Sequence, residues 1–128
     1  MSFFGNTTVN PDAISHSFLD FYYGAVSSKG WNATLSGYDE TCICSVNGHS
    51  NKPFDLVALL AAEGVARGTL INPLATWKHK EDQLYLTVTA GVTFISFAGY
   101  QVSNKILVDN FIISMSKCKI LDHTMHIR

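Results

Sequence analysis

The sequence predicts a single α+β domain in which a curved, mostly antiparallel sheet wraps around helices. Helical spacing of apolar residues comes first, and strand patterns then follow one another from residue 69 to the C-terminus. A chain of 128 residues is long enough for one domain with a real core and too short to expect two. We therefore expect one domain over residues 11–128, preceded by a flexible N-terminus over residues 1–10.

The first helix is predicted over about residues 11–27. Asn10-Pro11-Asp12 combines an N-cap residue, a proline at the first helical position and an acid in the first turn. Gly30 suits the position just after the helix, and Trp31 to Leu35 can form a short second helix. One stripe at helical spacing is expected to be buried: Ile14, Phe18, Phe21, Tyr22 and Ala25.

A hairpin and another helix are predicted next. Residues 40–46 have strand composition, and Asn47-Gly48 is the strongest short hairpin signal, so that residues 49–51 form the return strand. Pro53 fits the first turn of a helix over residues 53–66.

From residue 69 onward the chain has one strand pattern after another. Pro73 interrupts the first of these, over residues 70–79, and a proline cannot donate to a sheet, so an edge strand or a bulge is expected. Residues 83–97 form the clearest strand, with Gly91 suggesting a bend or bulge. The alternation places an aliphatic face on the helices and a Tyr/Thr face outside: Leu84, Leu86, Val88, Ala90, Val92 and Phe94 against Tyr85, Thr87, Thr89, Gly91, Thr93 and Ile95.

A loop over residues 98–104 and a last hairpin of strands 105–116 and 119–127 complete the prediction. Both faces of the first of these strands are mostly apolar, so the sequence does not decide which face is inside. One face carries Asp109, and for this acid an orientation toward solvent or a partner is favoured. The two faces are Leu107, Asp109, Phe111, Ile113 and Met115 against Val108, Asn110, Ile112 and Ser114.

Composition points to a binding partner. The chain is 47% hydrophobic and only 15% charged, which is more apolar than a typical monomeric domain. A sheet with apolar residues on both sides needs a second cover besides the helices. We expect this cover to be another protein's sheet, burying about 800 Å² per partner.

Several functional classes are disfavoured. The net charge is −1 and no basic stripe is present, so direct nucleic-acid binding is not expected. No apolar run is long enough to predict insertion into a membrane, and the start lacks a signal-peptide pattern, so Cys42, Cys44 and Cys118 are expected to be reduced. One C-x-C with a lone third cysteine falls short of a zinc site, and no phosphate-binding glycine loop is present. We expect no metal and no cofactor.

Three segments in consistent order resemble the nuclear transport factor 2 family, a cone-shaped α+β fold. They are Phe18-Leu19-Asp20-Phe21-Tyr22-Tyr23 in the first helix, residues 87–97 followed by Val108-Asp109-Asn110-Phe111-Ile112-Ile113, and the closing strand over residues 119–127. Within that family the order of elements is most similar to the small subunit of the mRNA export receptor heterodimer.

This resemblance implies a non-enzymatic subunit that stabilises a larger mRNA export receptor subunit through a sheet-to-sheet heterodimer. It also implies docking of nucleoporin phenylalanine-glycine repeats, and a location at the nucleus and nuclear pore with shuttling to the cytoplasm. A family arginine at the heterodimer contact aligns with His126. The partner-binding residues are expected to be Thr87, Thr89, Thr93, Asn110, Ile112, His126 and Arg128.

Two alternatives remain. The family's homodimeric transport factor binds GDP-bound Ran through acids in the loop before the penultimate strand, but residues 98–104 contain no acid, so only a different cargo is expected. The resemblance also admits a small pocket enzyme, an isomerase or dehydratase that uses Asp109, Tyr22 and His123. Against an open catalytic cavity, bulky side chains are expected to fill the cone: Phe18, Phe21, Tyr22, Leu84, Leu86 and Val88.

Overall fold

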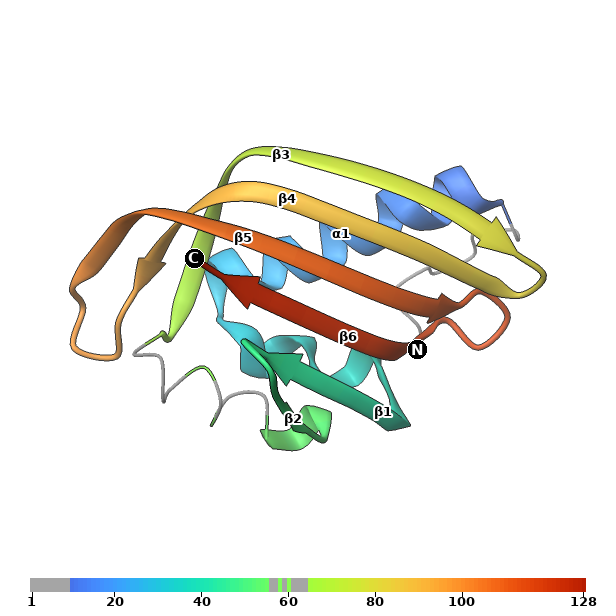
Figure 1. Ribbon diagram of the computed structural model, residues 1–128, viewed down its shortest axis with the longest axis horizontal. Coiled ribbons are helices and arrows are strands. Elements are labelled where there is room, and N and C mark those ends of the chain that lie inside the picture. The colour runs from blue at the N-terminus through green and yellow to red at the C-terminus, as the bar shows by residue number, and fades with distance from the viewer. Residues whose placement is uncertain (1–9, 56–57, 59, 61–64) are drawn as a thin grey trace.

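The computed structural model describes residues 10–55, 58, 60 and 65–128, and it is an α+β fold with one long helix behind a curved six-stranded sheet (Figure 1). The predicted fold class is confirmed. The strand order is β2-β1-β6-β5-β4-β3. Along the chain the elements are α1 (Pro11–Ser28), the 3-10 helix η1 (Trp31–Gly37), β1 (Tyr38–Val46), β2 (His49–Asn51), the 3-10 helix η2 (Pro53–Asp55), β3 (Arg67–Lys80), β4 (Gln83–Ile95), β5 (Gln101–Ser114) and β6 (Lys119–Ile127).

Two predicted segments fall largely outside the described residues. These are the flexible N-terminus, of which only Asn10 is described, and the helix over residues 53–66, of which η2 and a few further residues are described.

The predicted first helix is confirmed, together with its cap. The Asn10 side chain accepts hydrogen bonds from the backbone N–H of Asp12 at 3.0 Å and of Ala13 at 3.3 Å, which satisfies donors that the first turn leaves free. Gly30 follows the C-cap with φ = 98°, a left-handed backbone that glycine adopts without strain. The buried face consists of Ile14, Ser15, Phe18, Tyr22 and Val26, whereas the predicted Phe21 and Ala25 are only half-buried.

The sheet is mostly antiparallel, with one parallel pair. The β1–β2 hairpin turns at Asn47-Gly48 as predicted, and β3, β4, β5 and β6 pair antiparallel in succession. β1 then pairs parallel to β6, with Cys44 opposite His123. This pair joins the N-terminal hairpin to the C-terminal strands in one sheet.

Pro73 has the consequence predicted for it. β3 is the edge strand of the sheet, and its register against β4 shifts between Ile71 and Leu74. Asn72 has φ = 49° at this irregularity, and Gly91 of β4 lies opposite Ile71. The bulge accommodates a residue without an N–H, and such bulges bend a strand and increase its twist.

The predicted loop over residues 98–104 is wrong in its second half. β5 begins at Gln101, because residues 96–100 already close a tight turn: the Ser96 N–H donates to the Tyr100 carbonyl at 2.8 Å and the Gly99 N–H to the Ser96 carbonyl at 3.0 Å. The residues that follow pair with the end of β4, as Val102 does with Phe94.

The core lies between α1 and the inner face of the sheet, the face that carries the aliphatic residues of β4. Phe18 and Tyr22 of α1 pack on Phe111 of β5, with ring centroids 4.7 and 5.0 Å apart. All six aliphatic and aromatic β4 residues predicted to face the helices are at most 4% exposed, which confirms the period-two assignment. Within the described residues, no helix has the length and apolar character that crossing a membrane requires.

Truncation of Phe111 should test this packing. Phe111→Ala removes a ring that contacts Phe18, Tyr22 and His123 at once, and we expect it to lower the free energy of unfolding by about 3–5 kcal/mol. The measurement is urea denaturation followed by circular dichroism. Thr89→Ala, at an exposed position of β4, is the control and should change the stability by less than about 0.5 kcal/mol. Equal losses in both variants would contradict the assignment of faces.

Candidate functional site

A polar cluster lies inside the apolar core. Asp109 of β5 and His123 of β6 are both completely buried, so the favoured orientation of Asp109 toward solvent or a partner is wrong. The reason is the register: Asp109 pairs with Val88 of β4, and directly paired residues share a face. Val88 faces the helix, and therefore Asp109 does too.

The hydrogen bonds of the cluster form a continuous chain. Asp109 Oδ1 lies 2.7 Å from His123 Nε2, and His123 Nδ1 lies 2.8 Å from the Tyr38 hydroxyl. The Tyr38 and Tyr22 hydroxyls are 2.8 Å apart. At the other end, the Tyr23 hydroxyl donates to Asp109 Oδ2. Both carboxylate oxygens and both imidazole nitrogens therefore have partners, as buried polar groups require.

The charge state of the imidazole follows from these contacts. Burial alone lowers the pKa of His123, but the charge of Asp109 and the hydrogen bond to it outweigh burial and raise this pKa to about 9. Near neutral pH the ring is then protonated and donates from both nitrogens, to Asp109 and to Tyr38. Burial, followed by the charge of Asp109, raises the pKa of Tyr22 and Tyr23 well above the usual value. These phenols therefore stay neutral.

Sequence analysis found only part of this cluster. Asp109, Tyr22 and His123 were proposed together as an alternative catalytic set, and the structure brings all three together. The sequence did not indicate Tyr23, which contacts Asp109, or Tyr38, which contacts His123. Tyr23 sits one position from the apolar stripe of α1, and Tyr38 lies where only the parallel β1–β6 pairing brings it to His123, so no local signal marked either residue.

Chemically, an acid, an imidazolium and three phenols in one chain could exchange protons with a bound molecule. Asp109 and His123 are completely buried, whereas Tyr23, at one end of these hydrogen bonds, is half-buried. Phe18, Tyr22, Leu84, Leu86 and Val88 are each at most 1% exposed and fill the interior, as predicted, whereas Phe21 is half-buried. None of the pockets that we describe among residues 10–55, 58, 60 and 65–128 is lined by Asp109 or His123.

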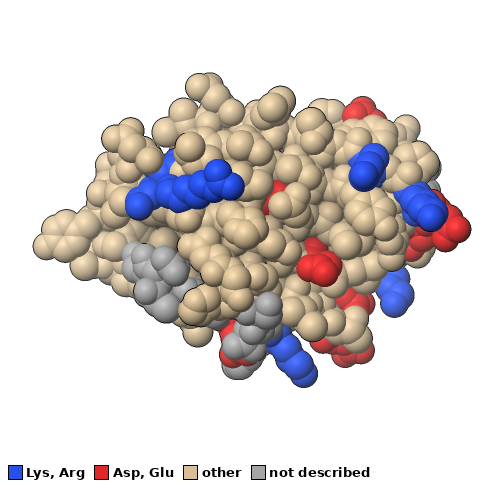
Figure 2. Space-filling view, viewed as in Figure 1, with Lys and Arg blue, Asp and Glu red and all other residues tan. Residues whose placement is uncertain are grey.

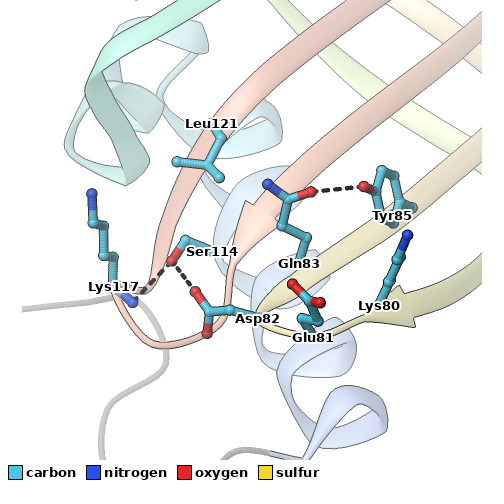
Figure 3. Close-up of a pocket in the computed structure, with 8 residues that line it drawn as sticks. All are labelled: Lys80, Glu81, Asp82, Gln83, Tyr85, Ser114, Lys117 and Leu121. Carbon is cyan, nitrogen blue, oxygen red and sulfur yellow. Dashed lines mark hydrogen bonds between the residues drawn. The ribbon is translucent and has the colours of Figure 1, made fainter.

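A pocket of about 440 Å³ lies at the end of the sheet where the β3–β4 and β5–β6 turns meet (Figure 3). Its centre is the Asp82 carboxylate, which accepts from the Ser114 hydroxyl at 2.7 Å and from the Ser116 N–H and hydroxyl, each at 2.8 Å. Although desolvation raises the pKa of Asp82, these hydrogen bonds hold it below the usual value. Asp82 thus fastens one turn to the other, and its acceptor capacity is used within the protein. Ser114, which the alternation groups with Val108, Asn110 and Ile112, is buried after a register shift between Ile112 and Ile113.

The second candidate site is the outer face of the sheet, which we define as the side chains of β3–β6 that point away from α1. Register places these side chains in rows across the strands, and the middle row is polar, with the Thr87 hydroxyl donating to Asn110 Oδ1 at 2.9 Å. The rows are Leu74, Thr89, Val108 and His126; Thr76, Thr87, Asn110 and Thr124; and Lys78, Tyr85, Ile112 and Asp122.

The residues predicted to bind a partner lie together on this outer face. Thr87, Thr89 and Thr93 are on β4, Asn110 and Ile112 on β5, His126 on β6, and Arg128 directly follows β6, where its backbone pairs with Ile106. Every one of them is at least partly exposed. The fold thus brings the whole set to one surface.

The outer face is apolar for an exposed surface. Leu74 is 66% exposed, Ile71 50% and Ile106 49%, and Ile43 of β1 continues the face at 56%. Figure 2 shows this side of the molecule covered mainly by uncharged side chains, with scattered patches of red and blue. A hollow of about 350 Å³ near the middle is lined by Tyr85, Thr87, Asn110 and Ile112 among others.

Among the described residues, no group of three or more His, Cys, Asp or Glu side chains is placed to hold a metal ion. Cys42 and Cys44 are free thiols buried in the core, where they pack as small hydrophobic side chains.

Comparison with known proteins gives the fold its name. No protein family matches the sequence, and no curated protein sequence matches it. Solved structures do match: nuclear transport factor 2 from Cryptosporidium parvum has a TM-score of 0.71 at 13% identity, covering 91% of this chain and 94% of that one. A cystatin-like protein of unknown function from Nostoc punctiforme has a TM-score of 0.67 at 8% identity, covering 91% and 90%. A polyketide cyclase candidate from Xanthomonas campestris has a TM-score of 0.62 at 13% identity, covering 91% and 92%.

The fold is therefore nuclear transport factor 2-like, also called cystatin-like, and it is shared by transport factors and by proteins classed with enzymes. Identities this low establish the fold alone. The function has to be argued from the two sites.

The buried cluster predicts a specific pH dependence of stability. Because the pKa of His123 is raised from 6.5 to about 9, the folded state holds a proton that the unfolded state releases. The stabilisation is complete below pH 6.5 and is lost as the pH rises through about 9. We expect the free energy of unfolding to fall across this window by an amount on the order of 3 kcal/mol.

Urea denaturation at a series of pH values measures this fall, and His123→Gln is the control. The variant should be less stable at pH 6.5 and should show little slope up to pH 9. Identical slopes in the two proteins would mean that the proton is not held by His123.

Proposed function

We propose that this protein is a non-enzymatic docking subunit that pairs through the outer face of its sheet with a second nuclear transport factor 2-like domain. More specifically, we propose that it is the small subunit of an mRNA export receptor heterodimer, that it supports docking of nucleoporin phenylalanine-glycine repeats, and that it works at the nucleus and nuclear pore.

The observation that carries this proposal is an exposed, largely uncharged sheet face opposite a fully packed one. α1 covers the inner face, while Leu74, Ile71 and Ile106 of the outer face remain about half exposed or more. Large apolar side chains that gather on one exposed face mark interaction sites in soluble proteins. The middle row with Thr87 and Asn110 supplies the polar groups that fix the register of a partner.

A partner of the same architecture fits the face best. The outer face is broad and spans four neighbouring strands, and such a surface is most simply covered by another curved sheet. The structural likeness to nuclear transport factor 2 supports a transport role over a catalytic one only weakly, because a polyketide cyclase candidate shares the fold. The burial of Asp109 and His123 away from solvent supports the same choice more strongly.

The register of the interface can be tested with neighbouring residues of β5. Ile112 lies on the outer face and is partly exposed, whereas Ile113 is completely buried. Ile112→Asp should leave the fold intact and weaken pairing by at least about 2 kcal/mol, roughly thirtyfold in affinity, because it places an unpaired charge in the interface. Ile113→Asp should instead prevent folding.

Circular dichroism reports the folding of these variants, and co-purification with the partner subunit reports the pairing. Asp20→Lys, an exposed position on α1, is the control that changes charge away from the outer face. Full pairing by folded Ile112→Asp would place the partner elsewhere and remove the basis of the proposal.

The exposed outer face also predicts the association state of the isolated chain in solution. Expressed alone, the protein should self-associate, because the outer face exposes several large apolar side chains to water. Co-expression with the correct larger subunit should give a soluble one-to-one complex. Analytical ultracentrifugation distinguishes these states for a 14.1 kDa chain. A monomer that persists at high concentration would argue against any sheet-to-sheet interface, and a discrete homodimer would favour a homodimeric transport factor over the heterodimer.

A small pocket enzyme of the same fold is the second candidate, and the chain of hydrogen bonds through Asp109 and His123 is what favours it. An isomerase or dehydratase would use Asp109 as base and Tyr22 or His123 as acid. The test is a fragment screen monitored by the side-chain NMR signals of His123. A compound that enters the cone and shifts the His123 signals would support the enzyme function. If no compound shifts these signals, the docking function is supported.

A further inference from the structure

The second half of the edge strand β3 is open to solvent on both of its faces. All of the residues from Leu74 to Lys80 are exposed. Ala75, Trp77 and His79 point to the side of α1, because they pair with β4 residues that face the helix. Their exposure shows that α1 leaves this part of the inner face uncovered. This segment of β3 is therefore accessible from the outer side, from the inner side and along its edge.

The free edge of this segment offers backbone hydrogen bonds. β3 is the last strand of the sheet, and among the described residues no strand pairs with its other side (Figure 1). Along an edge strand every second residue directs its N–H and C=O groups away from the sheet. Pro73 lacks an N–H, and the bulge beside it interrupts this row of groups. The segment after the bulge, Leu74 to Lys80, has an ordinary strand length and is the part of the edge that can pair.

A hollow of about 310 Å³ lies along the same segment. Its lining comes from β3 and from the neighbouring strand β4, and consists of Thr76, Trp77, Lys78, Tyr85 and Thr87. When a strand is added to a sheet, backbone hydrogen bonds supply affinity, and recesses beside the edge accept alternate side chains. Here a recess for a side chain lies next to the free hydrogen-bonding groups.

Trp77 provides apolar surface on the inner side of the edge. Its ring is 38% exposed and its centroid lies 6.1 Å from that of the His79 imidazole. A residue of an added strand that stood opposite Trp77 would place its side chain on this ring, because directly paired residues share a face. The inner side of the edge therefore favours apolar side chains.

The charges of β3 select the sign of its partner. The strand carries Arg67, Lys78 and Lys80 and no acid, and the two lysines lie on the outer side of the open segment. In the turn that follows, Asp82 is bonded to the β5–β6 turn, and Glu81 lies past the end of the strand. A second copy of this chain would bring the same cations to the edge, and like charges oppose the pairing of two such strands. An acidic segment is attracted instead.

We infer that the open segment of β3, residues 74–80, receives an extended acidic segment of a partner protein as an added strand. Acidic side chains of that segment lie beside Lys78 and Lys80, and apolar side chains lie beside Trp77. The segment therefore alternates acidic and apolar residues, because successive side chains of a strand point to opposite faces. It occupies the edge of the sheet and leaves the outer face free, so this inference does not depend on the proposed pairing of sheets.

The chain offers a direct spectroscopic test because it contains two tryptophans, Trp31 and Trp77. Trp77 lies in the proposed site, whereas Trp31 is 2% exposed and belongs to η1, so its indole N–H signal is an internal control. The full ¹⁵N-labelled chain, in its soluble assembly, is titrated with acetyl-Glu-Val-Glu-Val-Glu-Val-Glu-amide. Trp77→Phe assigns the two indole signals.

We expect the Trp77 indole signal to move, the Trp31 signal to stay, and the dissociation constant to be about 1 mM or lower. Lys78→Glu should weaken binding at least about tenfold, because it replaces attraction by repulsion at the edge. Lys29→Glu makes the same change of charge at an exposed position that follows the end of α1, and it should leave binding unchanged.

A modified peptide tests the backbone pairing separately from the charges. The same peptide with a methyl group on every backbone nitrogen keeps its side chains and its charge but cannot donate a backbone hydrogen bond. We expect it to leave the Trp77 signal unmoved, because the added strand is held to β3 by these bonds.

Four results would overturn the inference. The first is a Trp77 signal that does not move up to about 5 mM peptide, a concentration at which even millimolar affinity is visible. The second is equal binding of acetyl-Lys-Val-Lys-Val-Lys-Val-Lys-amide, which would remove the preference for acidic segments. The third is equal binding of the methylated peptide, which would exclude pairing of strands. The fourth is a Trp77 signal that moves with the concentration of the Ile112→Asp protein alone, which would assign the edge to a second copy of the chain.

Discussion

The ion pair between Asp109 and His123 is the interaction on which the arrangement of the sheet depends. It joins β5 to β6 inside the core, and each of its polar atoms has a partner on another element: Tyr23 on α1 and Tyr38 on β1. A slip of β5 by one residue would expose Asp109 and leave a protonated His123 buried without its counter-charge, which typically costs about 3–5 kcal/mol. Side-chain alternation along β5 would not prevent such a slip, because both faces of the strand are mostly apolar. The buried pair therefore specifies the register.

Register in turn determines what the protein presents to its surroundings. With Asp109 inside, Asn110 and Ile112 are outside, beside Thr87 and Tyr85 of β4. The bulge at Pro73 and the twist of the long strands curve this surface, and α1 leaves it uncovered. The polar groups of the core are used in internal hydrogen bonds, and the exposed sheet face is largely uncharged, with several exposed apolar side chains.

Local signals in the sequence predicted most of the fold, and long-range contacts account for what they missed. Asn10 with its following proline marks the start of α1, and the alternation in β4 marks the core face, because each depends on neighbours in sequence. The orientation of Asp109 depends on pairing with β4 and on a histidine of the next strand, and the sequence of an apolar strand contains neither. Tyr38 reaches His123 only through the parallel β1–β6 pairing, which links residues 85 positions apart. The outward position of Thr87, Thr89 and Thr93 follows from the alternation of β4 alone, whereas that of Asn110 and Ile112 depends on the pairing of β5 with β4.

The central claim is that the outer face is the surface through which this protein meets its partner. Site-specific photo-crosslinking in the native cell tests it most directly, with a photoreactive phenylalanine analogue replacing Ile112 in one variant and Asp20 of α1 in another. The account predicts that the analogue at position 112 crosslinks to one larger protein, at residues on the sheet of a similar domain, and that the analogue at position 20 does not. Crosslinks to that protein from position 20 but not from position 112 would contradict it.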